Sequence, residues 1–344
     1  METVGFVPEP NCGRGTVGII WTCLTTIFLS TWTSMHMHDY QPPTIYMVMK
    51  VTIWGVYFFI PELAALGAIR LLFSAWTTRR ALRLIPGSGW ERCTLRQAFL
   101  FGVLERFVSI AGQAEESLSM EEFTRLARSG KIRYSQLPDD DQIKARSKSD
   151  SLSKGIAIVQ MLWFAASIVA RLVAKHPISL LEDVTVAYVF CGLAIFIAYY
   201  RCPQNVQEPF VLRGQDTDTR NTDGEQVGDH VSSNLEPSEA VVVPIAILIT
   251  AIYTGIYLAA WNYPFASTTE AWLWRLLSIA GGILVVTWIS LSKLTKDEID
   301  LVFLAVLGLA RLGIIVLALM AFRQAPAGIY QKPSWVAYWG HIGG

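Results

Sequence analysis

The residues best suited to chemistry in this sequence are charged and amide side chains set inside long apolar stretches. Glu62 follows Pro61 in one stretch with Arg70 further on, and Gln160 and Arg171 share another. Charged groups within a membrane are costly, so they usually face a partner, a cavity or a bound molecule. These side chains are therefore the candidate catalytic residues: Arg171, Glu62, Arg70 and Gln160.

Four further residues are candidate substrate-binding groups. Trp163 and Tyr188 supply aromatic surface for an apolar pocket, Glu182 lies in the turn before the stretch that holds Tyr188, and Arg311 is near the centre of the last stretch. The charged residues also have a structural interpretation, as members of intramembrane ion pairs. Arg70 lies about two helical turns beyond Glu62 on the same face, so these two residues are a candidate pair.

Motifs for other chemistries do not appear in the sequence. Asp139–Asp141 lacks the later carboxylate of a magnesium–diphosphate site and is interpreted as a solvated turn. H-E-x-x-H, G-x-S-x-G and the Walker lysine are missing. Met35–Asp39 has metal-ligand residue types but no accompanying cluster, and Asn11–Thr16 is interpreted as a helix cap or interface anchor. The five dispersed cysteines indicate free thiols. We predict neither a metal nor a cofactor.

The composition is typical of a membrane protein. Apolar residues make up 52% of the 344-residue chain and charged residues only 16%, whereas soluble domains are about one quarter charged. The net charge is zero and there is no basic arm, which argues against a nucleic-acid partner. The predicted partners are the lipid bilayer and a hydrophobic small molecule.

Seven stretches are long enough to cross a bilayer, which takes about 20 largely apolar residues. We therefore predict an all-α fold, a polytopic membrane helix bundle of about seven transmembrane helices with additional interfacial amphipathic helices. The predicted spans are Val17–Thr33, Val51–Trp76, Ile156–Ala174, Val184–Tyr200, Ala240–Trp261, Trp272–Leu291 and Leu301–Phe322.

The connections divide the chain into three parts. Residues 1–212 hold spans one to four and an amphipathic loop at 77–154, residues 213–239 are predicted to be a disordered linker, and residues 240–344 hold the last three spans. Within the loop, Gln97–Gly112 is predicted to be an interfacial or re-entrant helix. Ser119–Glu122 is a capping box for a short helix that ends at Gly130.

The positions of lysine and arginine predict the orientation. The loop at 77–154 carries 14 of the 28 basic residues. By the positive-inside rule, this loop and the N-terminus are cytosolic and the C-terminus is lumenal or exterior. The expected location is an endomembrane such as the endoplasmic reticulum.

Short motifs in a specific combination extend over nearly the whole chain. They are Asn11–Thr16, Ile20–Leu24, Thr26–Leu29, Ile60–Glu62, Lys148–Asp150, Lys154–Gly155, Gln160 with Trp163–Phe164, Ala170–Arg171, Leu181–Glu182, Tyr199–Tyr200, Pro333–Trp335 and His341–Ile342. Together they resemble a large family of fungal integral membrane proteins, most without an assigned function. The sequence departs from the family pattern at Arg96–Phe99, Leu104–Arg106 and Tyr199–Pro203.

The resemblance implies a function, because some members are similar to natural-product enzymes that carry out a Diels–Alder cyclisation. It implies a cyclase of fungal secondary metabolism acting on a hydrophobic terpenoid. Such a reaction needs an apolar cavity that orients the substrate and one or two hydrogen-bond donors, without a cofactor. Two alternatives remain open: a transporter or receptor for a lipophilic metabolite, or a scaffold that recruits pathway enzymes through Ser119–Arg133.

Overall fold

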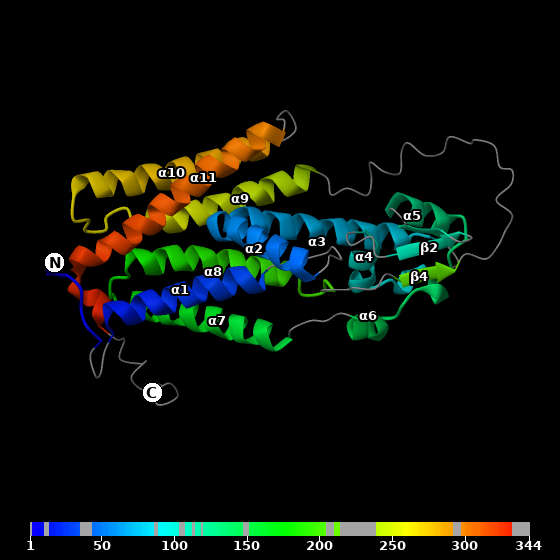
Figure 1. Cartoon of the computed structure of the whole chain (residues 1–344), viewed down its shortest axis with the longest axis horizontal. Coiled ribbons are helices and arrows are strands. Elements are labelled where there is room, and N and C mark those ends of the chain that lie inside the picture. Colours follow the sequence, from blue (N-terminus) through cyan, green and yellow to red (C-terminus); the bar gives the residue numbers. More distant parts are fainter. Residues whose placement is uncertain are drawn as a thin grey trace.

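The apolar stretches fold into long helices that lie side by side, with a smaller group of helices and strands at one end (Figure 1). The computed structural model describes residues 2–9, 14–34, 43–85, 89–102, 107–111, 114–117, 120–146, 151–203, 210–213, 239–291 and 297–331. In this part of the chain, six helices are long and apolar enough to cross a membrane. They are α1 (Thr16–Thr33), α7 (Ser151–Val173), α8 (Leu180–Ala198), α9 (Glu239–Ala259), α10 (Thr268–Leu291) and α11 (Asp297–Met320). The protein is therefore an all-α, multi-pass membrane protein, as predicted.

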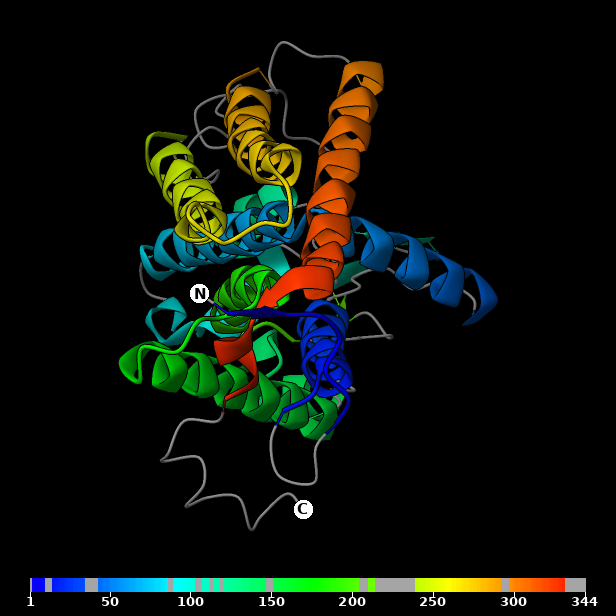
Figure 2. The ribbon, with the colours of Figure 1, turned by 90° about the vertical axis from the view of Figure 1, so that its left-hand side faces the viewer.

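Helix α8 is the most buried of the six, with 67% of its apolar window inside the protein against 28–39% for the others. It packs against α1, α7, α9 and α11, and an apolar surface on every side suits this central place. In a view along the bundle, α9 to α11 (yellow to red) lie on one side of α8, and α1 (blue) and α7 (green) lie on the other side (Figure 2). The acidic pair Glu182–Asp183, predicted in the preceding turn, belongs to the first turn of α8.

The predicted span Val51–Trp76 is divided between two helices. Helix α2 (Pro43–Phe59) and helix α3 (Pro61–Arg83) meet at a bend of 109°. Ile60 between them is not helical, and Pro61 occupies the first turn of α3. Proline has no N–H to continue the hydrogen-bond ladder of a preceding helix, but its fixed φ suits the start of a new one.

The α2–α3 pair enters and leaves the bundle at the same end. Near its middle, α2 lies beside the last turn of α1, where Trp54 Nε1 donates to Thr31 Oγ1 at 3.0 Å and Lys50 lies 4.5 Å from the Trp32 ring. The end of α2 reaches the middle of α8, since the Phe58 carbonyl accepts the hydroxyl of Tyr188. Helix α3 then returns to the end from which α2 came (Figure 1). The pair is thus a re-entrant hairpin.

Both ends of the described chain lie at the opposite end of the bundle. Strand β1 (Thr3–Val4) pairs antiparallel with β5 (Ala325–Pro326). In the sequence, β5 lies between the short helices η4 (Ala321–Gln324) and η5 (Ala327–Tyr330). Six crossings return the chain to its starting side, in agreement with this pairing. The expected cytosolic N-terminus with a lumenal or exterior C-terminus would need an odd number of crossings.

The group at the other end, which we call the end module, has its own core. It contains η1 (Trp90–Arg92), α4 (Leu95–Gly102), α5 (Met120–Arg128), η2 (Tyr134–Gln136) and α6 (Asp140–Arg146). Its sheet has the order β3–β2–β4, with β2 (Phe107–Ala111) antiparallel to β3 (Ala114–Ser117) and parallel to β4 (Phe210–Arg213). The core includes Trp90, Leu100, Phe123 and Ile143.

The end module corrects two predictions and confirms one. Gln97–Gly112 is not one helix, because α4 ends at Gly102 and β2 follows. Asp139–Asp141 begins α6 and is not a plain turn, since Asp139 accepts from the Gln142 N–H at 2.7 Å. Gly130, with a φ of 74°, follows the last turn of α5 as predicted. The capping residue Ser119, the linker at 214–238 and Met35–Asp39 lie outside the described residues.

We expect epitope tags at the N- and C-termini to share one side of the membrane. A tag inserted after Ser129, an exposed residue of the end module, should be on the other side. Protease protection in sealed vesicles will measure this. Terminal tags that differ in protection would contradict the six-span arrangement.

Candidate functional site

A buried ion pair between Glu62 and Arg311 lies at the break between α2 and α3. Glu62 is in the first turn of α3, where the helix dipole favours a negative charge. The two side chains are 0% and 1% exposed, and Arg311 Nη2 donates to Glu62 Oε1. The predicted partner was wrong: Arg70 is exposed on α3, and the partner of Glu62 comes from α11.

Aromatic rings surround the guanidinium of Arg311. Its central carbon is 4.6 Å from the ring centroid of Tyr253 and 5.2 Å from that of Tyr257, distances that allow cation–π attraction. The two tyrosine hydroxyls share a hydrogen bond of 2.7 Å, and Trp274 Nε1 donates to the Tyr257 carbonyl at 3.0 Å. The guanidinium is thereby fixed between α9 and α10 as well as against α3.

The pair is not fully satisfied by protein groups. Glu62 Oε2 and the Nε and Nη1 atoms of Arg311 are buried without a protein hydrogen-bond partner. Buried ion pairs with unused hydrogen-bonding capacity contribute little net stability, although loss of one partner is expensive. The geometry therefore fits a role in holding particular helices together.

Tyr188 is buried beside this pair, and its hydroxyl ties α8 to the end of α2. It lines a small cavity together with Tyr57, Pro61 and Cys191. The cavity volume is about 10 Å³, close to the room that one water molecule needs. Tyr188 lines this cavity, which is too small for a terpenoid.

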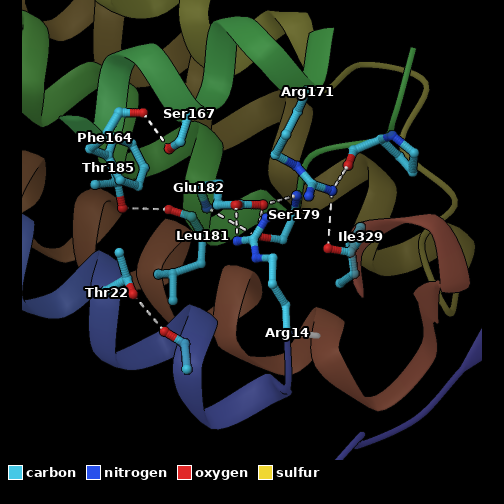
Figure 3. A network of polar contacts seen from close by, with 12 residues as sticks. Arg14, Thr22, Phe164, Ser167, Arg171, Ser179, Leu181, Glu182, Thr185 and Ile329 are labelled. Carbon is cyan, nitrogen blue, oxygen red and sulfur yellow. Dashed lines mark hydrogen bonds and ion pairs between the residues drawn. The ribbon is translucent and has the colours of Figure 1, made fainter. Parts of the chain in front are cut away.

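A second polar cluster lies at the end of the bundle that carries the chain termini (Figure 3). Ser179 begins α8 and forms a capping box with Glu182, in which the Ser179 N–H donates to Glu182 Oε2 at 2.9 Å. The other carboxylate oxygen of Glu182 accepts a hydrogen bond from Arg14, just before α1. Glu182 therefore joins the starts of α1 and α8.

Arg171, in the last turn of α7, belongs to the same cluster. Its Nη1 donates to the Gln331 carbonyl at 2.7 Å, and its Nη2 donates to the carbonyls of Pro177 and Ile329 at 2.6 and 3.0 Å. Gly328 allows this close approach, because a Cβ there would lie 2.7 Å from the Pro177 ring. Arg171 thus fastens the C-terminal segment Ala321–Gln331 to the bundle.

The other predicted residues lie apart from both clusters. Gln160 Nε2 donates to Thr26 Oγ1 at 3.0 Å and joins α7 to α1. Trp163 is 47% exposed on the outside of α7, so its predicted place in a pocket is not observed. With Arg70 exposed as well, the eight candidates divide into two clusters and three isolated positions.

A larger hollow, absent from the predictions, lies between α9 and α10. This groove has a volume of about 400 Å³ and is lined by apolar residues together with Thr250, Thr254 and Thr287. Gly255 and Gly282 help to form it: a Cβ on Gly255 would meet nothing within 4 Å, whereas one on Gly282 would lie 2.5 Å from Thr254 Oγ1. None of the eight predicted residues lines it.

The groove and the ion pair lie on opposite sides of α9 and α10. Tyr253 contacts Arg311, whereas the next residue, Thr254, lines the groove. On α10, a Cβ on Gly281 would lie 3.1 Å from Arg311, whereas Gly282 faces Thr254. The spacing of Tyr253 and Tyr257 by one helical turn was a sequence signal for this site.

Comparison with known proteins adds one match. Residues 95–222 match the model of a family of unknown function, DUF8562, over less than half of the chain. The matched region includes α4 to α8 and the three-stranded sheet of the end module. No curated protein matches the chain, and no solved structure matches it. Fold and site define a polytopic α-helical membrane protein with a buried ion pair.

We expect Arg311→Met to destabilise the protein by about 3–5 kcal/mol, because it leaves Glu62 charged and buried without a partner. The double variant Glu62→Gln/Arg311→Met should recover most of this loss. Thermal unfolding in detergent, followed by tryptophan fluorescence, will measure it. Arg70→Met, at an exposed position of α3, is the matched control, and an equal effect there would contradict the interpretation.

We expect Arg171→Ala to release Ala321–Gln331, because the segment loses three carbonyl contacts at once. Hydrogen exchange of peptides from this segment should rise, with little change in the middle of α9. Arg275→Ala is the control, since Arg275 donates to the Trp261 carbonyl in another connection. Unchanged exchange in 321–331 would show that Arg171 does not hold the segment.

Proposed function

We propose that this protein is a membrane-embedded cyclase of fungal secondary metabolism, which folds a hydrophobic terpenoid for an intramolecular Diels–Alder reaction. The observation that supports the proposal is the groove between α9 and α10. Its volume of about 400 Å³ is within the range of about 300–1,000 Å³ for small-molecule sites. The proposal also rests on the family resemblance of the short sequence motifs, which we extend to the norbornene-forming Diels–Alderase of sordarin-type diterpene glycoside biosynthesis.

The groove has the properties that a pericyclic reaction requires. In a Diels–Alder cyclisation, two carbon–carbon σ bonds form from π bonds while no proton or electron leaves the substrate. An apolar wall that holds the diene against the dienophile lowers the entropic part of the barrier. Ile247, Ile279 and Ile283 are exposed at the groove, so a terpenoid dissolved in the bilayer reaches it directly.

The threonines supply the polar groups of the proposed site. Thr250 Oγ1 donates to the Ala246 carbonyl at 2.9 Å, whereas Thr254 Oγ1 is buried without a protein partner. A hydroxyl that donates to a dienophile carbonyl polarises it and stabilises the charge that develops there. We assign this role to Thr254.

The ion pair supports the groove from behind. Glu62 holds Arg311, and Arg311 contacts Tyr253 on α9 and approaches Gly281 on α10, so it sets the separation of the two helices. Glu62 and Arg311 are positioning residues in this proposal. A catalytic role for Arg171, Arg70 or Gln160 stays a prediction without a contact to the groove.

We also propose that the end module is cytosolic, in an endomembrane such as the endoplasmic reticulum. Most of the lysine and arginine residues that the structure describes lie at this end of the bundle, and the positive-inside rule favours a cytosolic place for it. Six crossings then put both termini on the lumenal side, which replaces the expected cytosolic N-terminus. The cytosolic module is the surface available to pathway enzymes.

The test is conversion of a diterpenoid that carries a cyclopentadiene and an alkene, by purified protein in detergent without added cofactor. We expect Gly255→Phe to lower product formation at least roughly tenfold, since the ring occupies the groove and excludes the substrate. Product is measured by mass spectrometry and chromatography.

Gly67→Phe on α3 is the matched control, because a Cβ at either glycine meets nothing within 4 Å. Activity unchanged in Gly255→Phe would place the site elsewhere. If folded wild-type protein forms no product above the uncatalysed rate, the proposed activity is wrong.

The re-entrant hairpin favours transport of a lipophilic metabolite as a second candidate function. Interrupted membrane helices with charged groups at the break are typical of substrate sites in transporters. Glu62 occupies such a break. In vesicles, a transporter would move labelled terpenoid across the membrane and leave it unchanged, whereas the cyclase would convert it.

A further inference from the structure

Two arginines at the end of α3 share one backbone acceptor. Arg79 Nε and Arg83 Nε both donate to the carbonyl of Cys93, at 3.0 and 3.1 Å. The residues are one helical turn apart, where like charges repel. In the described part of the chain neither arginine has an ion-pair partner, and their Nη groups have no protein acceptor.

The nearby groups leave this positive charge in place. Asp140 is engaged by Thr94 Oγ1 at 2.7 Å and by Arg96 at 3.4 Å. Burial raises the pKa of the Cys93 thiol to about 11, so the thiol is neutral at physiological pH. Glu91 is exposed on η1 and makes no ion pair within the described residues. Among the described residues, the arginine pair therefore lacks a counter-charge.

The pair lies near the outer edge of the lipid headgroups. Glu62 is near the middle of the bundle, and Arg79 and Arg83 are about 25 and 31 Å further along α3 at 1.5 Å per residue. These heights are upper limits, because any tilt of α3 lowers both. Headgroups begin about 15 Å from the bilayer centre and extend to about 22 Å. Trp76, 49% exposed with the Arg80 guanidinium 5.9 Å from its ring, has the character of an interfacial anchor.

We propose that Arg79 and Arg83 bind the phosphate of an anionic phospholipid in the leaflet on the side of the end module. Guanidinium groups match phosphate oxygens with paired N–H donors, and two of them suit a phosphate monoester such as phosphatidic acid. The Cys93 carbonyl fixes both side chains through Nε, so part of the ordering entropy is lost before the lipid arrives.

Apolar surface beside the arginines favours a lipid over a soluble phosphate. Leu84, next to Arg83, is 76% exposed, and Trp76 is exposed one turn before Arg80. Trp76, which lies on the bilayer side of the arginines, can contact the glycerol and acyl region of a bound lipid, which a soluble anion lacks. A phospholipid and a soluble anion both offer a phosphate to the arginines. Apolar contacts beside the arginines are available only to the phospholipid.

The test is native mass spectrometry of the full-length protein from nanodiscs of phosphatidylcholine with 20% phosphatidic acid. We expect Arg79→Gln/Arg83→Gln to lower the occupancy of bound phosphatidic acid by roughly tenfold or more, because two charge-assisted hydrogen-bond donors are lost. Arg128→Gln/Lys131→Gln removes the same charge from exposed positions of the end module and should retain the wild-type occupancy.

A measurement on the unmodified protein covers the case in which the double variant does not fold. Phosphatidic acid should raise the thermal unfolding midpoint more than phosphatidylglycerol does, whereas millimolar inorganic phosphate should neither raise it nor displace the lipid. Equal lipid occupancy in folded Arg79→Gln/Arg83→Gln, or an equal loss in the control, would overturn the site. Displacement by inorganic phosphate would overturn its assignment to a lipid.

Discussion

The ion pair between Glu62 and Arg311 is the interaction on which the arrangement of the helices depends. The break at Pro61 turns the chain back inside the bundle and leaves a carboxylate at a depth where an isolated charge is very unfavourable. Its partner comes from a position 249 residues later in the chain. The pair thus sets how α9 to α11 meet the N-terminal helices, and its aromatic surroundings set how α9 meets α10.

Much of the fold could be predicted from hydropathy, because a bilayer requires long apolar helices whatever their partners are. Hydropathy could not predict whether each apolar stretch crosses the membrane or turns back within it. Val51–Trp76 has the apolar length of a span, and hydropathy does not distinguish a crossing from a hairpin that turns back at Pro61. One crossing more or fewer places the C-terminus on the other side of the membrane. Pro61 indicates a break in the helix, but a proline alone does not predict the bend of 109° between α2 and α3.

The candidate site was predicted in part. Glu62, Arg171, Glu182, Tyr188 and Arg311 are buried, as polar groups within apolar stretches should be. Their partners were not predictable, because Arg171 binds backbone carbonyls that leave no pattern in the sequence, and Arg311 is far from Glu62 along the chain. The groove depends on glycines and threonines, which are ordinary residues at contacts between membrane helices. Its existence follows from helix packing.

The pairing of strand β1 with strand β5 has a consequence for biogenesis. Thr3–Val4 pairs with Ala325–Pro326, so a segment made at the start of synthesis has no partner until α11 has been made. At about 5–20 residues per second, this wait is on the order of tens of seconds. During that time the start of the nascent chain must avoid other contacts on its side of the membrane. The β1–β5 pairing therefore forms only after α11 has been made, and a chain released before that point cannot form it.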